Sequence, residues 1–153
     1  MDGVGLFRTE FLYMGRATLP GEDEQYNVYR RVLEAFGKKP VVLRTLDIGG
    51  DKKVDCMTLP QEQNPFLGER ALRLCFAQPH IFRTQLRAAL RASAHGTLWI
   101  MFPMVGSVED FLRARAMLEE ERRALLEQGY PVSERLRIGA MIEIPSMALC
   151  ADA

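Results

Sequence analysis

Four short apolar runs divide the chain, and each is followed by a longer stretch of mixed polarity. The runs are continuous and do not alternate with polar residues, which is typical of strands in a parallel sheet covered on both faces. We therefore predict four strands, over residues 3–7, 41–43, 98–102 and 138–142.

The stretches between the runs have the periodicity of helices. The first is predicted to begin at the acidic cluster 22–24, which suits the positive end of a helix dipole, and to end before Gly37. Further helices are predicted over 68–76 and 79–94. Another begins at Ser107, with Asp110 three residues on in a capping-box spacing, and ends at Gly129. A last helix starts at Pro145.

Strands and helices thus alternate, and two architectures have this pattern: an open doubly wound sheet and part of an eight-fold barrel. A complete barrel needs roughly 250 residues, so these 153 residues hold about four of its units. A dinucleotide-binding sheet would carry a glycine fingerprint after the first strand. This chain has Arg8-Thr9-Glu10 there, which argues against that site. In either architecture the strands are expected to be parallel, and in the barrel they follow the order 1-2-3-4.

Composition narrows the class of protein further. The chain is 48% hydrophobic and 26% charged with a formal net charge of zero, so nothing in it favours nucleic acid or an anionic membrane surface as a partner. No apolar run approaches the roughly 18 residues of a membrane span. Three widely spaced cysteines, with no C-x-x-C pair, argue against a disulfide framework or a zinc site. We therefore expect a cytoplasmic protein with reduced thiols and no membrane insertion.

Charged residues follow three of the predicted strands. Arg8, Arg44 and Glu143 come at strand ends that share one edge of a parallel sheet, the edge where such folds keep their active sites. Arginine suits a phosphate or carboxylate, and a carboxylate facing a phosphorylated ligand is a typical ligand of Mg²⁺. The pattern predicts an anion site with a metal. An alternative stays open, in which Glu143 balances the arginines in a structural ion-pair network.

Two other features have simpler interpretations. Gly49 and Gly50 precede Asp51-Lys52 without the spacing of a phosphate-binding P-loop, so they either let the backbone approach a ligand or shape a turn. An arginine stripe at i, i+4 and i+8 on the helix 79–94 is interpreted as a solvated face; it consists of Arg83, Arg87 and Arg91.

Five motifs in order make the chain resemble a known family. They lie at residues 3–12, 44–52, 64–71, 101–104 and 141–145. The first and last are similar to the barrel domain of phosphoenolpyruvate-utilising enzymes, including pyruvate phosphate dikinase and phosphoenolpyruvate synthase. The second, with Asp47-Ile48-Gly49-Gly50, resembles Enzyme I of the bacterial sugar phosphotransferase system, the phosphoenolpyruvate–protein phosphotransferase family.

The resemblance implies a parallel (β/α) half-barrel, the first four strands of a TIM barrel, spanning residues 1–153. It implies that Arg8 and Arg44 bind the phosphate of phosphoenolpyruvate, that Arg70 borders the same pocket, and that Glu143 is one of two carboxylates on Mg²⁺. The phosphoryl group would pass to a histidine on another domain and then to the carrier HPr, in a homodimeric parent enzyme. No catalytic residue is expected within this chain, which alone should be inactive. The alternatives are a fragment of a dikinase or synthase, and a non-catalytic half-barrel used for dimerisation or binding.

Overall fold

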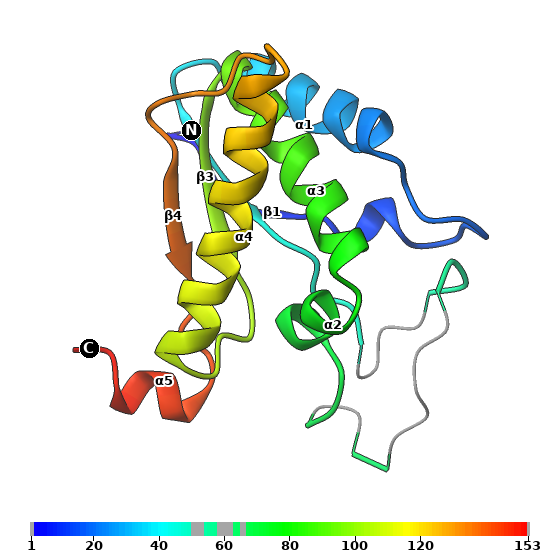
Figure 1. Ribbon diagram of the computed structural model, residues 1–153, viewed down its shortest axis with the longest axis vertical. Coiled ribbons are helices and arrows are strands. Elements are labelled where there is room, and N and C mark those ends of the chain that lie inside the picture. The colour runs from blue at the N-terminus through cyan, green and yellow to red at the C-terminus, as the bar shows by residue number, and fades with distance from the viewer. Residues whose placement is uncertain (1, 50–53, 58–62, 65–66, 153) are drawn as a thin grey trace.

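The computed structural model describes residues 2–49, 54–57, 63–64 and 67–152. Within them a single sheet contains β1 (Val4–Arg8), β2 (Pro40–Arg44), β3 (Thr97–Phe102) and β4 (Arg137–Ala140), in that order (Figure 1). All three neighbouring pairs are parallel. The predicted order 1-2-3-4 is confirmed. A sheet that runs through four units without reversal fits the start of a barrel, whereas a doubly wound sheet has a point where the order reverses.

Helices connect the strands much as predicted. They are α1 (Glu22–Phe36), α2 (Ala71–Ala77), α3 (Pro79–Ala92), α4 (Val108–Glu127) and α5 (Pro145–Leu149), with 3-10 turns at Glu10–Leu12 and Ser93–His95. The Ser107 hydroxyl caps α4 by accepting the Asp110 N–H at 3.1 Å, as the capping-box spacing predicts. Among the described residues, none of the helices has both the length and the hydrophobicity that crossing a membrane requires.

The end of β4 differs from the prediction of a strand over 138–142. Its last paired residue is Ala140, opposite Phe102 at the end of β3. The Met141 N–H still donates to the Phe102 carbonyl at 2.9 Å, but β3 then turns through Met104, whose φ is +53°. Residues after Met141 therefore have no neighbouring strand to pair with, and Ile142 is 50% exposed.

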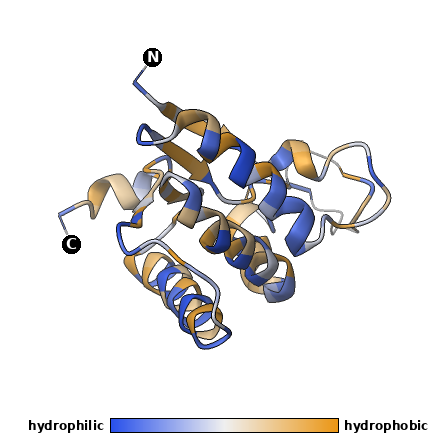
Figure 2. Ribbon diagram, turned by 90° about the horizontal axis from the view of Figure 1, so that it is seen from above, coloured by the Kyte–Doolittle hydropathy of each residue, from blue (hydrophilic) through white to orange (hydrophobic). Residues whose placement is uncertain are grey.

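Helices pack on one face of the described sheet, as expected for part of a barrel whose helices lie on the outside. Along β3, Leu98, Ile100 and Phe102 are buried and alternate with partly exposed residues. The Phe102 ring makes edge contacts with Phe82 of α3 and Phe111 of α4, at centroid distances of 6.0 and 6.1 Å. The helices present a hydrophobic and a hydrophilic side (Figure 2). On the opposite face of the described sheet, the alternate residues of β3 are only partly buried.

The arginine stripe of α3 is not a solvated face. Arg87 and Arg91 both bind the Glu22 carboxylate of α1, at 2.7 and 2.6 Å. Arg83 binds Glu121 of α4 at 2.6 Å. The stripe therefore joins three helices through ion pairs, which helical periodicity alone does not predict because the partners come from other elements.

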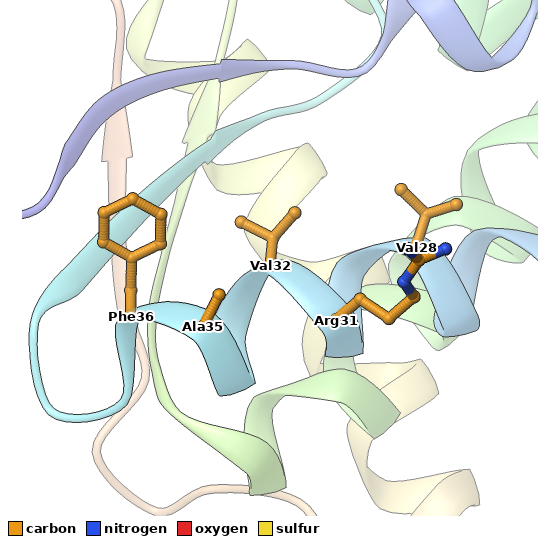
Figure 3. A pocket seen from close by; sticks show the side chains of 5 residues that line it. All are labelled: Val28, Arg31, Val32, Ala35 and Phe36. Atoms are coloured by element: carbon orange, nitrogen blue, oxygen red, sulfur yellow. The ribbon is translucent and has the colours of Figure 1, made fainter.

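A shallow groove runs along α1. It is lined by Val28, Arg31, Val32, Ala35 and Phe36, and the side chains of Val28, Val32 and Phe36 extend from one side of the helix (Figure 3). None of the residues predicted to bind a ligand lies in it.

Candidate functional site

Arg44, the last residue of β2, is a buried cation held by two carboxylates. The residue is 6% exposed. Its Nη2 lies 2.5 Å from Glu10 Oε1 and 3.0 Å from Asp47 Oδ2. Both carboxylates are themselves buried, Glu10 at 2% and Asp47 at 3% exposure. A charge can remain in such a place only when it is paired, so the three side chains depend on one another.

The same two carboxylates bind the other predicted arginines. Arg8, at the end of β1, approaches Glu10 Oε1 through Nε and Nη2 at 3.4 Å. Arg70, just before α2, donates from Nη2 to Asp47 Oδ1 at 2.9 Å. The charges alternate along the row, from Arg8 at the end of β1 to Arg70 before α2. We call this row, Arg8–Glu10–Arg44–Asp47–Arg70, the arginine network.

The backbone after β2 explains how Arg70 reaches the network. Gly49 has φ +117°, and a Cβ there would lie 2.5 Å from Arg70 Cβ. The Ala71 N–H donates to the Ile48 carbonyl at 2.9 Å. Only glycine permits this close approach, so Gly49 brings the start of α2 against the loop that follows β2. Its neighbour Gly50 and residues 51–52 of the motif lie outside the described residues, as do residues 65–66 of the next motif.

Arg44 is fixed at its backbone as well. The Thr9 hydroxyl donates to the Arg44 carbonyl at 2.9 Å. Gln85 of α3 donates to Thr9 Oγ1 at 3.1 Å and accepts the Leu46 N–H at 2.8 Å. The Thr9 hydroxyl, the Gln85 amide and the Arg44 carbonyl are thus hydrogen-bonded in the interior, and α3 holds the ends of β1 and β2 together.

One side of the Arg44 guanidinium retains donors. Both of its ion pairs use Nη2. Nη1 makes only a 3.8 Å contact with the sulfur of Met141, and Nε has no hydrogen-bond partner among the described residues. Because Nε is itself enclosed, Nη1 at the carboxyl end of the strand is the donor offered to a phosphate or carboxylate oxygen.

Glu143 lies outside the arginine network. It is exposed, three residues after β4, and its Oε1 accepts the Met104 N–H at 2.7 Å. Among the described residues it makes no ion pair with Arg8 or Arg44. The open alternative, in which Glu143 balances the charge of these arginines, is therefore wrong. Glu10 and Asp47 are the carboxylates that pair with them.

The described residues do not form a metal site by themselves. Within residues 2–49, 54–57, 63–64 and 67–152, no group of three or more His, Cys, Asp or Glu side chains could hold a metal ion. Glu143 offers one carboxylate, whereas Mg²⁺ needs several oxygen ligands around it. The described residues therefore supply one carboxylate of the expected magnesium site, Glu143, and not a complete set of ligands.

A buried thiol lies beside the network. Burial raises the pKa of Cys75, and the negative charge of Asp47 raises it further. The group stays a neutral thiol at physiological pH, so it is not a nucleophile in this state. Cys56 and Cys150 are also free, so none of the three cysteines forms a disulfide.

The fold and the site define a class: a parallel α/β domain with arginines gathered at the carboxyl edge of its sheet. The whole chain, residues 1–153, matches the family described as PEP-utilising enzyme, PEP-binding domain. The chain belongs to this family.

Individual relatives are similar over almost the entire chain. It is 58% identical over 151 residues to the phosphoenolpyruvate-protein phosphotransferase of Staphylococcus epidermidis. It is 57% identical, over the same number of residues, to the enzymes of that name from Geobacillus stearothermophilus and Bacillus subtilis. These alignments cover 99% of this chain but 26% of each relative, so the chain spans about a quarter of their length.

Proposed function

We propose that this chain is the phosphoenolpyruvate-binding part of a phosphotransferase that transfers the phosphoryl group of phosphoenolpyruvate to a protein histidine. The relatives that match it carry the name of this enzyme, which favours this reaction over that of a dikinase or synthase. The observation that carries the proposal from the molecule itself is the arginine network at the carboxyl edge of the sheet.

The network has the properties that a phosphorylated ligand requires. Arginine stays protonated and offers paired donors that match phosphate oxygens. Arg44 is held by two carboxylates within 3.0 Å. The Arg8 side chain is 44% exposed and has weaker contacts, with Glu10 at 3.4 Å and with the Phe11 ring at 5.5 Å from its centroid, so it can turn onto a ligand. Arg70 is held near Arg44 because both arginines bind the Asp47 carboxylate. In the proposed reaction these charges stabilise the phosphoryl group as it passes to the histidine and the departing enolate, which then takes up a proton to become pyruvate.

The proposed reaction also needs a metal ion, a histidine and a carrier protein. Mg²⁺ is proposed as the cofactor, with Glu143 supplying one carboxylate and the remaining ligands coming from elsewhere in the parent enzyme. When bound, the ion neutralises phosphate charge. The phosphorylated histidine would pass its group to HPr at the start of sugar uptake, in a homodimeric cytoplasmic enzyme.

A chimaera tests the proposal. The segment of the Bacillus subtilis relative that aligns with this chain is replaced by the chain itself, at 57% identity over 151 residues. We expect the purified chimaera to release pyruvate from phosphoenolpyruvate and to phosphorylate HPr. Arg44→Ala should raise the KM for phosphoenolpyruvate about a hundredfold or more and slow both reactions accordingly. Arg30→Ala, which breaks an exposed ion pair with Glu34 on α1, should change neither reaction. A folded chimaera that leaves phosphoenolpyruvate intact would contradict the proposal.

A further inference from the structure

Glu10 is one of the most deeply buried carboxylates of the described chain, although it lies in a surface turn that follows β1. Its residue exposure is 2%, and its Oε1 lies 2.5 Å from Arg44 Nη2. The same oxygen accepts from Arg8 at 3.4 Å. One carboxylate oxygen therefore joins the arginines of two neighbouring strands.

Thr9 and Glu10 together hold Arg44 at both ends. The Thr9 hydroxyl binds the Arg44 carbonyl at 2.9 Å, and Glu10 binds the guanidinium. Two consecutive residues thus fix where the backbone of Arg44 lies and which way its side chain points. The contact with Glu10 uses Nη2 and directs Nη1 toward the end of β4, where it meets Met141.

Net stability is a poor explanation for this arrangement. The attraction within a buried ion pair is largely offset by the cost of removing both charges from water. What the pair does provide is a single orientation for a side chain that otherwise has many rotamers. A preoriented donor binds its ligand more tightly because less freedom is lost on binding.

We propose that Glu10 is a positioning residue, whose buried carboxylate orients the Arg44 guanidinium for the phosphate of phosphoenolpyruvate. The inference rests on the proposed function and deepens it. Glu10 binds no substrate itself and acts through Arg44. Its negative charge also reduces the repulsion between Arg8 and Arg44, the two arginines that share its Oε1.

Glu10→Gln in the full-length chimaera is the principal variant, because it keeps the shape of the side chain and removes its charge. We expect KM for phosphoenolpyruvate to rise about tenfold or more, since a charge-assisted hydrogen bond to Arg44 is weakened. A purely structural role would lower the fraction of folded enzyme, and with it the apparent kcat, but would leave KM unchanged. Glu34→Gln, which removes the charge from the exposed pair with Arg30, is the matched control and should behave like the parent chimaera.

A double-mutant cycle identifies the residue through which Glu10 acts. In an Arg44→Ala background, Glu10→Gln should raise KM no further, because the side chain that it positions is gone. If Glu10→Gln does not fold, Glu10→Asp keeps the charge and withdraws it by one methylene, and should raise KM in the same direction. An unchanged or lower KM in the folded Glu10 variant overturns the inference, and so does an additive effect in the Arg44→Ala background. If Arg44→Ala itself leaves KM unchanged, the proposed function fails instead.

Discussion

Arginine side chains at the ends of β1 and β2 differ in how firmly the protein holds them. The Arg44 side chain is 7% exposed and has two carboxylates within 3.0 Å, whereas the Arg8 side chain is 44% exposed. The buried arginine gives the site a fixed point. The exposed one can change rotamer at little cost, so a ligand that binds both would order mainly Arg8.

Thiol reactivity offers a check on the burial of the site. Cys75 is 1% exposed, and its pKa is raised by burial and by Asp47, so the group is a neutral thiol at pH 8. Cys150 is exposed. We expect iodoacetamide at pH 8 to alkylate Cys150 within minutes, and Cys75 only after unfolding in urea, as followed by peptide mass spectrometry. Equal rates at the two cysteines in the native protein would show that the core beside Asp47 opens.

The positions of Arg8 and Arg44 at one edge could be predicted from the apolar runs, because every parallel strand of a βα repeat ends on the same side. Arg70 could not, since it lies before a helix and reaches the edge only through Gly49; the family resemblance pointed to it. Glu10 and Asp47 were missed. They stand two and three residues after the arginines, but the direction of a side chain in a turn does not follow from the sequence pattern.

At the scale of elements, local signals set the beginning of a helix, and tertiary partners set the ends of strands. Ser107 and Asp110 predicted the first turn of α4 because the capping bond is local. The end of β4 depends on where β3 turns away, some forty residues earlier in the chain. The hydrophobic run 138–142 therefore predicts a strand that extends two residues past its last paired residue, Ala140. The interhelical ion pairs of Arg83, Arg87 and Arg91 were missed for the same reason.

The cap of α4 can be tested directly. Ser107→Ala removes the acceptor for the Asp110 N–H and should lower the free energy of unfolding by about 1 kcal/mol. Ser107→Asp, which supplies another acceptor at the same position, should retain most of it. Chemical denaturation of the chimaera, followed by circular dichroism, measures both. Equal stability of the alanine and parent proteins would mean that the hydroxyl contributes nothing to the helix.

At the scale of the whole molecule, β1 and β4 each have one neighbouring strand among the described residues, and apolar side chains remain exposed. On β1, Leu6 is 40% exposed, and the groove of α1 is lined mostly by apolar side chains. These surfaces fit the proposal that residues 1–153 form the first half of a TIM barrel, whose remaining strands and helices would cover them. Strand order could be predicted from the sequence, because short βα units place successive strands side by side. The sequence pattern alone could not distinguish an open doubly wound sheet from part of a barrel. The strand order 1-2-3-4, which has no reversal, favours the barrel.

An incomplete barrel should bind its ligand poorly. The isolated chain contributes the arginine network and one carboxylate, so we expect it to bind phosphoenolpyruvate with Mg²⁺ at least about a hundredfold more weakly than the chimaera and to turn over none. Titration calorimetry on both proteins measures the difference, with circular dichroism to show whether the chain alone is folded. Comparable affinities would favour the alternative in which the half-barrel is a binding module in its own right.

The most direct measurement for the central claim is the affinity of the chimaera for phosphoenolpyruvate with and without the Arg44 side chain. Titration calorimetry of the parent, Arg44→Ala and Arg30→Ala proteins compares a buried, preoriented arginine with an exposed one. Loss of a charged contact of this kind costs on the order of 3 kcal/mol, so we predict a weakening of a hundredfold or more for Arg44→Ala and no change for Arg30→Ala. An Arg44→Ala protein that is folded and binds phosphoenolpyruvate as tightly as the parent would contradict the account.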